Sequence, residues 1–391
     1  MKILFISEIQ ANTLYTSSTN IVTYNLIRGF MESNIDLYMI LIYDSDQKLS
    51  DIKQSLIKDN IKLSKIFFLN TKNPLRLKKS LILRYLELFR KAHQKRYYKI
   101  SNDLLEFITR ERFEIVFTNS PSIDSISLFN SLKLNKDFIF KKYAQLWSDP
   151  IASAGVNYLN IPFQRKILLL LENHLHKNAH KIFYFTDTLF LSQFHLFKNK
   201  KFEPIDLFFD YKNTSLSYRS SQFHNNINHI NCIYFGNYQS KIRNIFYLYQ
   251  YFKSNNINKL TIIGEGDNKY IKTSRMVRVI NKRFSKDEIH SILINHNFIV
   301  AILNKNTIQI PGKIFFDSNL PIPYLILLDG PFTENIQNYL TKFNRFYFVN
   351  NDFNSIKVFF EKNLFNNQFN YQSKIKSSNE IISELLSKLN I

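Results

Sequence analysis

The chain has 391 residues, of which 45% are hydrophobic and 15% aromatic, and its formal net charge is +21. This length predicts two domains, and the hydrophobic content excludes a wholly disordered chain. The first residues lack the pattern of a signal peptide, and no apolar run approaches the roughly 18 residues that span a bilayer, so we expect a soluble or peripheral protein. The single cysteine, Cys232, excludes an internal disulfide and favours a cytosolic location.

The excess of positive charge favours an anionic partner, which could be a nucleic acid, an anionic membrane face or a phosphorylated substrate. Lys, Asn, Ile and Phe are all abundant, as in proteins from AT-rich genomes, so background composition is the alternative explanation of the charge. No nucleic-acid-binding motif is recognisable, and the aromatic residues follow core spacing, so we do not expect nucleic acid as the partner.

In the first half, short apolar runs alternate with segments of helical spacing. The predicted elements are strand 2–7, helix 19–32, strand 36–43, helix 101–110, strands 114–118 and 138–146, helix 162–177 and strand 181–186. Gly29 stands near the end of helix 19–32 and is expected to form its exit. This alternation predicts a parallel sheet with crossover helices.

The stretch 75–99 is basic and carries an apolar stripe at helical spacing, with Leu81, Tyr85, Leu88 and Ala92. A basic amphipathic helix can lie on an anionic membrane face, so this stretch is a candidate membrane contact. The alternative is that the stripe packs on the domain and the cations are solvated.

After a polar stretch at 206–229, which we interpret as a linker, the alternation restarts. The predicted elements are strand 230–236, helix 244–254, strands 260–264 and 277–280, helix 285–293, strand 298–303, short helix 313–319, strand 324–328 and helix 375–389. The sequence 285–288 fits a capping box that opens its helix. We therefore predict two Rossmann-like domains, residues 1–205 and 206–391.

Seven glycines occur in the chain, and in so glycine-poor a sequence they are expected where a Cβ is not tolerated. Five lie in the second half, beside predicted strand ends or a helix start: Gly236, Gly264, Gly266, Gly312 and Gly330. The carboxyl ends of parallel strands are where open α/β sheets bind ligands. The alternative is that these glycines only form the turns between strands and helices.

Two segments of the second half are suited to binding a phosphate group. Lys241 and Arg243 follow a predicted strand and precede a helix, so they could neutralise a diphosphate near free helix amides. Pro311 and Gly312 form a predicted turn into a helix that begins at Lys313. Asp317 lies four residues later on the same face, where it could bind ribose hydroxyls or form an ordinary surface pair with the lysine.

Over nearly its whole length the chain resembles the family 4 retaining glycosyltransferases, which have the GT-B fold. In the second half the resemblance rests on four features. The first two are a glycine followed by cations, Gly236 with Lys241 and Arg243, and a G-x-G at Gly264, Glu265 and Gly266. The other two are a base-contacting loop at 279–285 with Arg283 and a P-x-K segment at Pro311, Gly312 and Lys313. In the first half, 146–150 resembles the family's tryptophan-containing acidic segment, and Glu172 with 178–182 resembles its glutamate helix and the strand that follows.

The sequence departs from the family pattern at two places. The family pairs two glutamates with seven residues between them, and here Gln309 and Asp317 have that spacing. Phe316 stands where the position of Lys313 predicts the second acid. The glycine-rich loop that the family has after the first strand is replaced by 17–20, which includes Ser18 and Thr19.

The resemblance implies two domains that face a cleft, with the C-terminal helix packing back toward the first domain. Its implied roles are leaving-group stabilisation by Lys241, Arg243 and Lys313; donor-sugar orientation by Gln309; donor binding by Gly236, Asn237, Gly264, Glu265, Arg283, Pro311, Gly312 and Asp317; and acceptor contacts from Ser18, Thr19, Trp147 and Asp149.

The resemblance also implies a UDP- or GDP-sugar donor, a glycan, lipid-linked or protein acceptor, and no obligatory cofactor or metal. His174, His176 and His180 come nearest to a metal cluster, but they do not share one helix face. We expect a cytoplasmic transferase of hexosyltransferase type in polysaccharide synthesis, peripheral on the inner membrane face, and a homo- or hetero-oligomer is an option. The alternative, which the departure at Gln309 and Asp317 motivates, is a non-catalytic GT-B subunit that binds and stabilises a partner glycosyltransferase.

Overall fold

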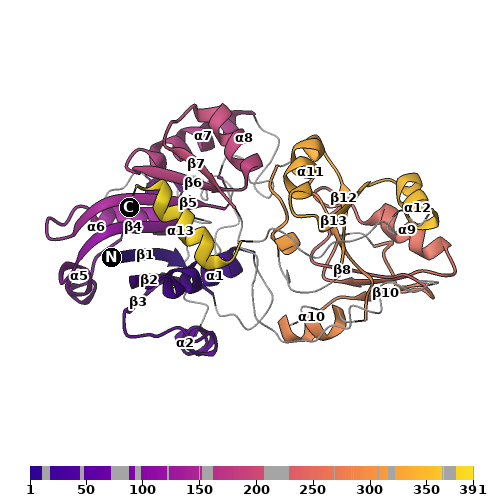
Figure 1. Cartoon of the computed structure of the whole chain (residues 1–391), viewed down its shortest axis with the longest axis horizontal. Helices are drawn as coiled ribbons and strands as arrows, with labels where there is room; N and C mark the ends of the chain where they lie inside the picture. Colours follow the sequence, from indigo (N-terminus) through magenta and orange to yellow (C-terminus); the bar gives the residue numbers. More distant parts are fainter. Residues whose placement is uncertain are drawn as a thin grey trace.

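The computed structural model describes most of the chain. The described residues are 1–10, 18–44, 48–71, 88–92, 98–120, 123–148, 150–151, 162–206, 229–267, 269–282, 284, 286–293, 295–305, 308–315, 322–362, 364 and 376–390. They form two α/β units that lie side by side (Figure 1). Among them, no helix combines the length and the apolar character that crossing a membrane requires.

The first unit is built on a seven-stranded sheet in which the strands pair in parallel in the order β3-β2-β1-β4-β5-β6-β7. Its elements are β1 (Lys2–Glu8), α1 (Ser18–Glu32), β2 (Asp36–Asp44), α2 (Leu49–Lys58), β3 (Ile66–Thr71), α5 (Asn102–Thr109), β4 (Arg112–Ser120), α6 (Asp124–Leu132), β5 (Ile139–Trp147), α7 (Pro162–His176), β6 (Lys181–Phe185), α8 (Asp187–Phe197) and β7 (Phe202–Ile205).

The second unit is built on a six-stranded parallel sheet in the order β10-β9-β8-β11-β12-β13. Its elements are β8 (Asn231–Phe235), α9 (Phe246–Ser254), β9 (Lys259–Ile263), β10 (Val277–Ile280), α10 (Lys286–Leu293), β11 (Phe298–Ile302), the 3-10 turn η2 (Gly312–Phe315), β12 (Tyr324–Leu328), α11 (Thr333–Thr341), β13 (Phe346–Asn350) and α12 (Phe353–Glu361). The last helix, α13 (Ser378–Lys388), follows.

Each sheet is covered on both faces, which explains the continuous apolar runs of the predicted strands. Along β1, Ile3 and Phe5 enter one core cluster and Leu4 and Ile6 enter the other, because successive side chains point to opposite faces. The strand β8 repeats this division between two clusters, and Cys232 is fully buried there.

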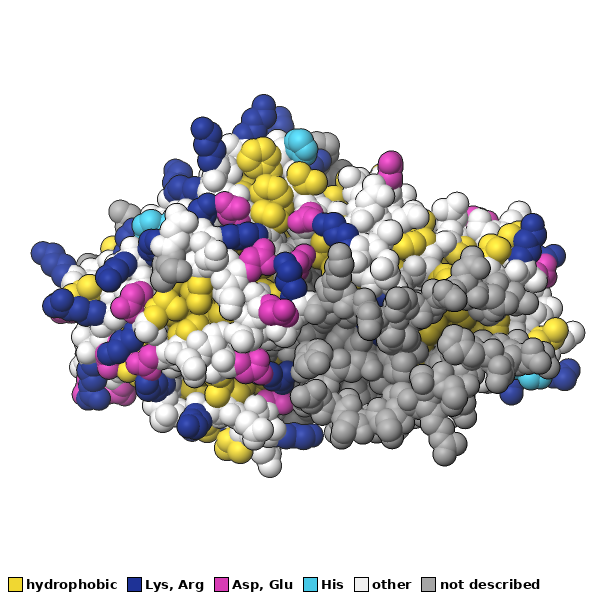
Figure 2. Space-filling view, in the orientation of Figure 1, with side chains coloured by type: hydrophobic (Ala, Val, Ile, Leu, Met, Phe, Trp, Pro, Cys, Tyr) yellow, Lys and Arg dark blue, Asp and Glu magenta, His cyan; other side chains and the backbone are white. Residues whose placement is uncertain are grey.

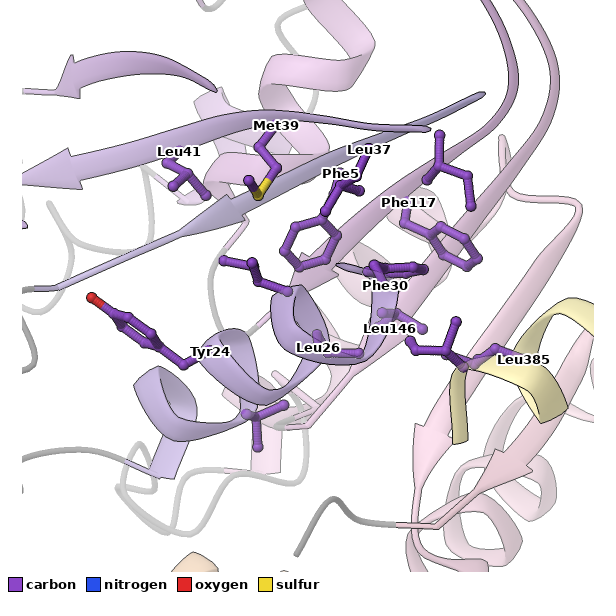
Figure 3. Close-up of a cluster of buried hydrophobic side chains, with 14 of the residues drawn as sticks. Phe5, Tyr24, Leu26, Phe30, Leu37, Met39, Leu41, Phe117, Leu146 and Leu385 are labelled. Carbon is purple, nitrogen blue, oxygen red and sulfur yellow. The ribbon is translucent and has the colours of Figure 1, made fainter. Parts of the chain in front are cut away.

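The helix α1 covers one face of the first sheet with its apolar stripe. Phe30 lies between Phe5 and Phe117, with ring centroids 5.6 and 5.4 Å away (Figure 3). The prediction that Gly29 forms the exit of this helix is wrong. The helix continues to Glu32, and the left-handed residue beyond it is Asn34, with φ of 53°.

Gly29 instead marks the place where α13 packs. A Cβ on Gly29 would stand 2.7 Å from the carbonyl oxygen of Ser378 and 2.8 Å from a side-chain carbon of Ile382. α13 begins with a capping box between Ser377 and Glu380 and buries Ile381, Ile382 and Leu385 in the core of the first unit. The C-terminal helix therefore packs back on the first domain, as predicted (Figure 1).

The predictions missed the strands β3, β7 and β13 and the helices α2, α6, α8, α11 and α12. All three missed strands lie at sheet edges, where burial is incomplete and the sequence carries a weaker apolar signal. The domain boundary at 205/206 stays a prediction. Of the predicted linker, residues 207–228 lie outside the described residues. The same holds for Ser285, the first residue of the predicted capping box.

Candidate functional site

The strand orders indicate where ligands bind. In each sheet the connections run outward in opposite directions from one central pair of strands, which is β1 and β4 in the first sheet and β8 and β11 in the second. Open α/β sheets bind ligands beyond the carboxyl ends of such a pair. These two edges are in contact, because η2, which follows β11, lies against α1, and Ile308 packs in a core cluster of the first unit.

The loops after β8 and β9 pack closely against each other at positions occupied by glycines. Gly236 and Gly264 have φ of +133° and +134°, and a Cβ on Gly264 would stand 2.3 Å from the carbonyl oxygen of Gly236. The amide of Tyr238 donates to the carbonyl of Glu265 at 3.0 Å, and a Cβ on Gly266 would collide with the Tyr238 ring. These glycines therefore stand where a Cβ is not tolerated, and packing between the two loops accounts for them.

Arg243 lies across the central pair of strands of the second sheet. Its Nε donates to Oδ1 of Asn304 at 2.7 Å, and Nδ2 of Asn304 donates to the carbonyl of Gln309 at 3.1 Å. Burial raises the pKa of Tyr234, and the hydrogen-bonded Arg243 guanidinium partly opposes that rise. Within the described residues Arg243 forms no ion pair, so neutral groups hold this cation in place.

Lys241 and Arg243 lie in the loop before α9 and not on the first turn of the helix. We predicted that the helix begins at Asn244, but α9 begins at Phe246. Lys241 is exposed and makes no side-chain hydrogen bond with a described residue, whereas Arg243 is half-buried and lines a small pocket with Phe235 and Pro311. The two cations thus differ in their contacts, and Arg243 is the one held by a hydrogen bond.

The segment 308–315 connects this edge to the first unit. Ile308, Ile310, Pro311 and Ile314 are buried, and Gln309 is half-buried between them. We predicted a helix over 313–319, but its described part is a single 3-10 turn that already begins at Gly312. The Lys313 side chain and the whole of Asp317 lie outside the described residues, as does Arg283.

The sequence interpretation missed three polar residues at this edge. Asn351 donates through Nδ2 to the carbonyl of Asn244 and to Oδ2 of Asp329, both at 2.9 Å. A Cβ on Gly330 would stand 2.2 Å from the carbonyl oxygen of Lys305. Asn304, Asp329 and Asn351 each come one or two residues after a strand end, and that position was the signal that could have revealed them.

At the carboxyl ends of the central strands of the first sheet, a buried ion pair takes the place of the arginine–asparagine contact. Nζ of Lys91 donates to Oδ1 of Asp124 at 2.6 Å, and the Tyr98 hydroxyl donates to the same oxygen. Burial alone would raise the pKa of Asp124, but Lys91, Glu8 and Tyr98 outweigh it, so the pKa lies below its usual range. Glu8 and Asp124 were not predicted as site residues, although Glu8 ends β1 and Asp124 begins α6.

The predicted acceptor-side residues are only partly described. Ser18 and Thr19 stand in the first turn of α1, and their side chains and the whole of Asp149 lie outside the described residues. Trp147 is fully buried, and its Nε1 donates to Oε1 of Gln145 at 3.0 Å. Its ring therefore does not reach a ligand and can only position the segment that follows β5.

The histidines of the first unit are used in packing. His176 is buried against Trp147, with its Nε2 3.1 Å from the Tyr184 hydroxyl, and burial lowers its pKa to about 3. Glu172 is also fully buried beside Tyr184. Among the described residues, no group of three or more His, Cys, Asp or Glu side chains could hold a metal ion.

No protein-family model and no curated protein matches the chain, but solved structures do. It is similar to a UDP-N-acetylglucosamine 2-epimerase, with a TM-score of 0.55 and 12% identity over 100% of this chain and 97% of the other. It is similar to a trehalose-6-phosphate protein from E. coli bound to UDP-2-fluoro glucose, with a TM-score of 0.54 and 9% identity over 99% and 96%. A lipopolysaccharide outer core galactosyltransferase gives a TM-score of 0.51 and 12% identity over 86% and 83%. With two parallel-sheet α/β units in one chain, the protein has the GT-B fold.

Proposed function

We propose that the chain is a glycosyltransferase that transfers a sugar from a UDP- or GDP-sugar to a glycan, lipid-linked or protein acceptor, with retained anomeric configuration. Its setting would be polysaccharide or glycoconjugate synthesis at the cytoplasmic face of a membrane, and its sugar a hexose. The proposal is supported by the fold, since similar structures include a galactosyltransferase and a protein bound to UDP-2-fluoro glucose.

One observation carries the proposal: Arg243 is held across β8 and β11 by the neutral side chain of Asn304, with the exposed Lys241 nearby. In sugar transfer the bond from the anomeric carbon to the diphosphate breaks, and charge builds on the diphosphate. The acceptor hydroxyl bonds to that carbon, and its proton passes to the departing diphosphate or to solvent. Fixed cations that keep their full charge stabilise that leaving group without reorganising.

The remaining roles follow from this placement. Arg243, Lys241 and Lys313 would bind the diphosphate, and Gln309 would orient the donor sugar. The rest of the donor would lie along the loops that follow β8, β9 and β10 and along the turn at 311–312. In that assignment Glu265 or Asp317 holds the ribose, Gly236, Asn237 and Gly264 line the loops, and Arg283 lies by the base. Asp149, Ser18 and Thr19 would contact the acceptor.

A second candidate is a non-catalytic subunit that binds a nucleotide-sugar and stabilises a partner glycosyltransferase. Gln309 favours it, because an amide cannot ionise and therefore cannot supply the carboxylate that the resembling family has there. Both candidates use the same donor edge, so they differ in turnover and not in nucleotide binding.

The proposal is tested by thermal unfolding with UDP, GDP and their sugar derivatives. A ligand that binds only the folded state stabilises it by about 2.7 kcal/mol at a hundred times its dissociation constant. We expect one nucleotide series to raise the melting temperature of the wild type. Arg243→Ala should abolish that rise, and Lys259→Ala, an exposed lysine at the opposite end of β9, should retain it.

Absence of a shift with every nucleotide, or an equal loss in both variants, would refute the donor site. The melting temperature of each variant without ligand is measured as well, because Arg243→Ala could destabilise the loop before α9 that contains this residue. Hydrolysis of the donor by the wild type, lost in Arg243→Ala, identifies the enzyme. Nucleotide binding without hydrolysis or transfer identifies the subunit.

A further inference from the structure

The outward surface of α7 and α8 exposes large apolar side chains. Leu170 is 67% exposed, Leu191 46%, Phe194 37% and Leu196 39%. Four of the thirteen exposed large hydrophobic residues of the described chain thus lie on two consecutive helices, whereas the others are spread over many elements. Figure 2 shows hydrophobic side chains gathered at the top of the molecule, where α7 and α8 lie in Figure 1. Single exposed apolar residues are ordinary, but a gathered group indicates a contact.

The helix α8 has more apolar surface than the fold uses. Of its eleven residues only Asp187 carries a full charge, and an α-helix that is apolar on all sides is normally buried. Yet only Thr188, Leu189 and Gln193 are buried, and Leu191 and Phe194 recur at helical spacing on the outward side. The domain core therefore does not account for this face.

Positive charge surrounds the apolar group. On α7, Lys166 and Leu170 are exposed four residues apart, and Lys177 is exposed directly after the helix ends at His176. Arg165 is exposed on the same helix, and Lys198 and Lys200 are exposed just beyond α8. Figure 2 shows Lys and Arg side chains around the hydrophobic ones.

Negative charge at this surface is neutralised. Residues 162–201 contain two acidic side chains against seven Lys and Arg. Glu172 is fully buried, and the carboxylate of Asp187 is paired with Lys342 of the second unit. An approaching anion therefore meets no uncompensated carboxylate from this stretch.

We propose that this α7–α8 surface, formed by Leu170, Leu191, Phe194, Leu196, Arg165, Lys166, Lys177, Lys198 and Lys200, binds the anionic face of a lipid bilayer. The apolar side chains would enter the boundary between headgroups and acyl chains, and the cations would lie against the lipid phosphates. A bilayer satisfies both halves of the surface at once, which neither a purely apolar nor a purely acidic partner does. The proposal does not depend on sugar transfer, because no donor or acceptor is needed for binding.

This surface differs from the basic stretch 75–99, our sequence-based candidate for membrane contact. Only 88–92 and 98–99 of that stretch are described, and there Lys91 and Ala92 are buried. Lys91 is neutralised by Asp124, and Ala92 packs with the core of the first unit. Lys91 and Ala92 are therefore not available to a membrane, whereas Arg90 and Lys99 are exposed, and the membrane contact of this stretch stays a prediction.

The test is sedimentation of the full chain with vesicles, either of phosphatidylcholine alone or of phosphatidylcholine and phosphatidylglycerol in equal parts. We expect the wild type to bind the anionic vesicles and not the neutral ones, with binding that weakens as salt rises. Leu191→Ser/Phe194→Ser should lower the partition coefficient at least about tenfold. Leu134→Ser/Val358→Ser, whose side chains are 44% and 42% exposed elsewhere, should leave it unchanged.

A charge-reversal pair separates this surface from the overall charge of +21. Each basic residue near an anionic bilayer contributes about fivefold to partitioning, so Lys166→Glu/Lys177→Glu should lower it at least about 25-fold. Lys253→Glu/Lys357→Glu changes the net charge equally on exposed residues of α9 and α12 and should have a far smaller effect. No vesicle binding by the wild type, or equal losses in both reversal pairs, would overturn the proposal. So would a wild-type dimer that Leu191→Ser/Phe194→Ser dissociates, because a second copy would then cover the surface.

Discussion

Each sheet has a cation at the edge of its central pair of strands, but the charge of that cation is met in opposite ways. Beside the central strands of the first sheet, Lys91 is buried and paired with the carboxylate of Asp124. Beside those of the second, Arg243 is half-buried and held by the neutral amide of Asn304. A carboxylate neutralises its partner, whereas an amide orients a guanidinium and leaves its charge for an incoming anion. The charge of Lys91 is thus used within the fold, whereas that of Arg243 stays available for the diphosphate that we propose.

The largest expected effect is on stability at the first edge. Asp124→Asn removes the carboxylate whose Oδ1 lies 2.6 Å from Nζ of the buried Lys91, and breaking a buried pair in this way typically costs about 3 kcal/mol or more. Urea unfolding should report that loss, whereas Asp137→Asn, an exposed residue after α6, should stay within about 0.5 kcal/mol of the wild type.

The acid dependence of that loss supplies a second readout. Because the folded-state pKa of Asp124 is lowered, its contribution is present above the unfolded value of about 3.9 and is lost as the pH falls through the folded-state value. The gap between wild type and Asp124→Asn should therefore narrow in acid. A gap that is constant with pH would mean that the carboxylate charge is not what stabilises Lys91.

The next effect concerns the buried imidazole of the first domain. The pKa of His176 is about 3 when folded and about 6.5 when unfolded, so the unfolded state binds more protons below pH 6.5 and stability falls as the pH falls. Between pH 7 and pH 5 this group should cost about 2 kcal/mol. His176→Gln should flatten that pH dependence in urea unfolding, and the exposed His195→Gln should not.

A smaller effect, on binding, tests the comparison directly. Asn304→Asp gives Arg243 the kind of partner that Lys91 has, and should raise the dissociation constant for the nucleotide diphosphate about tenfold, or 1.4 kcal/mol. It also removes the Nδ2 donor to the Gln309 carbonyl, so urea unfolding of the variant is measured alongside the affinity. Asn297→Asp is the matched control, because Oδ1 of Asn297 accepts the Asn231 amide at the opposite end of β8. Unchanged affinity in Asn304→Asp, measured by calorimetry, would show that the uncompensated charge of Arg243 is not used.

The smallest effect is expected at Lys241. Its side chain is exposed and makes no hydrogen bond with a described residue, so solvent screens its charge and ordering it on a ligand costs entropy. Lys241→Ala should weaken nucleotide binding less than about fivefold, and the loss should disappear at high salt. A loss as large as that of Arg243→Ala would mean that Lys241, and not the fixed arginine, carries the diphosphate contact.

Much of the carboxyl edge of the second sheet was predictable from sequence because its signals are local. Gly236, Gly264 and Arg243 stand within about ten residues of strands whose apolar runs are unmistakable, and parallel strands bring their carboxyl ends to one edge. The partners were not predictable. Asn304 is sixty-one residues from Arg243, and Asn351 is more than a hundred from Asn244, so no spacing connects them.

The sequence by itself determined the alternation of strands and helices in two α/β units and the tight turns at Gly236 and Gly264, because hydrophobic periodicity and turn chemistry act over a few residues. The return of the last helix was implied only by the family resemblance. Only the tertiary structure decided which charges are neutralised and which surfaces stay uncovered. Nothing in the residues next to Lys91 or Arg243 in the sequence predicts which of the two charges is neutralised. Whether a carboxylate or an amide meets each one depends on which distant segments the folded core brings together.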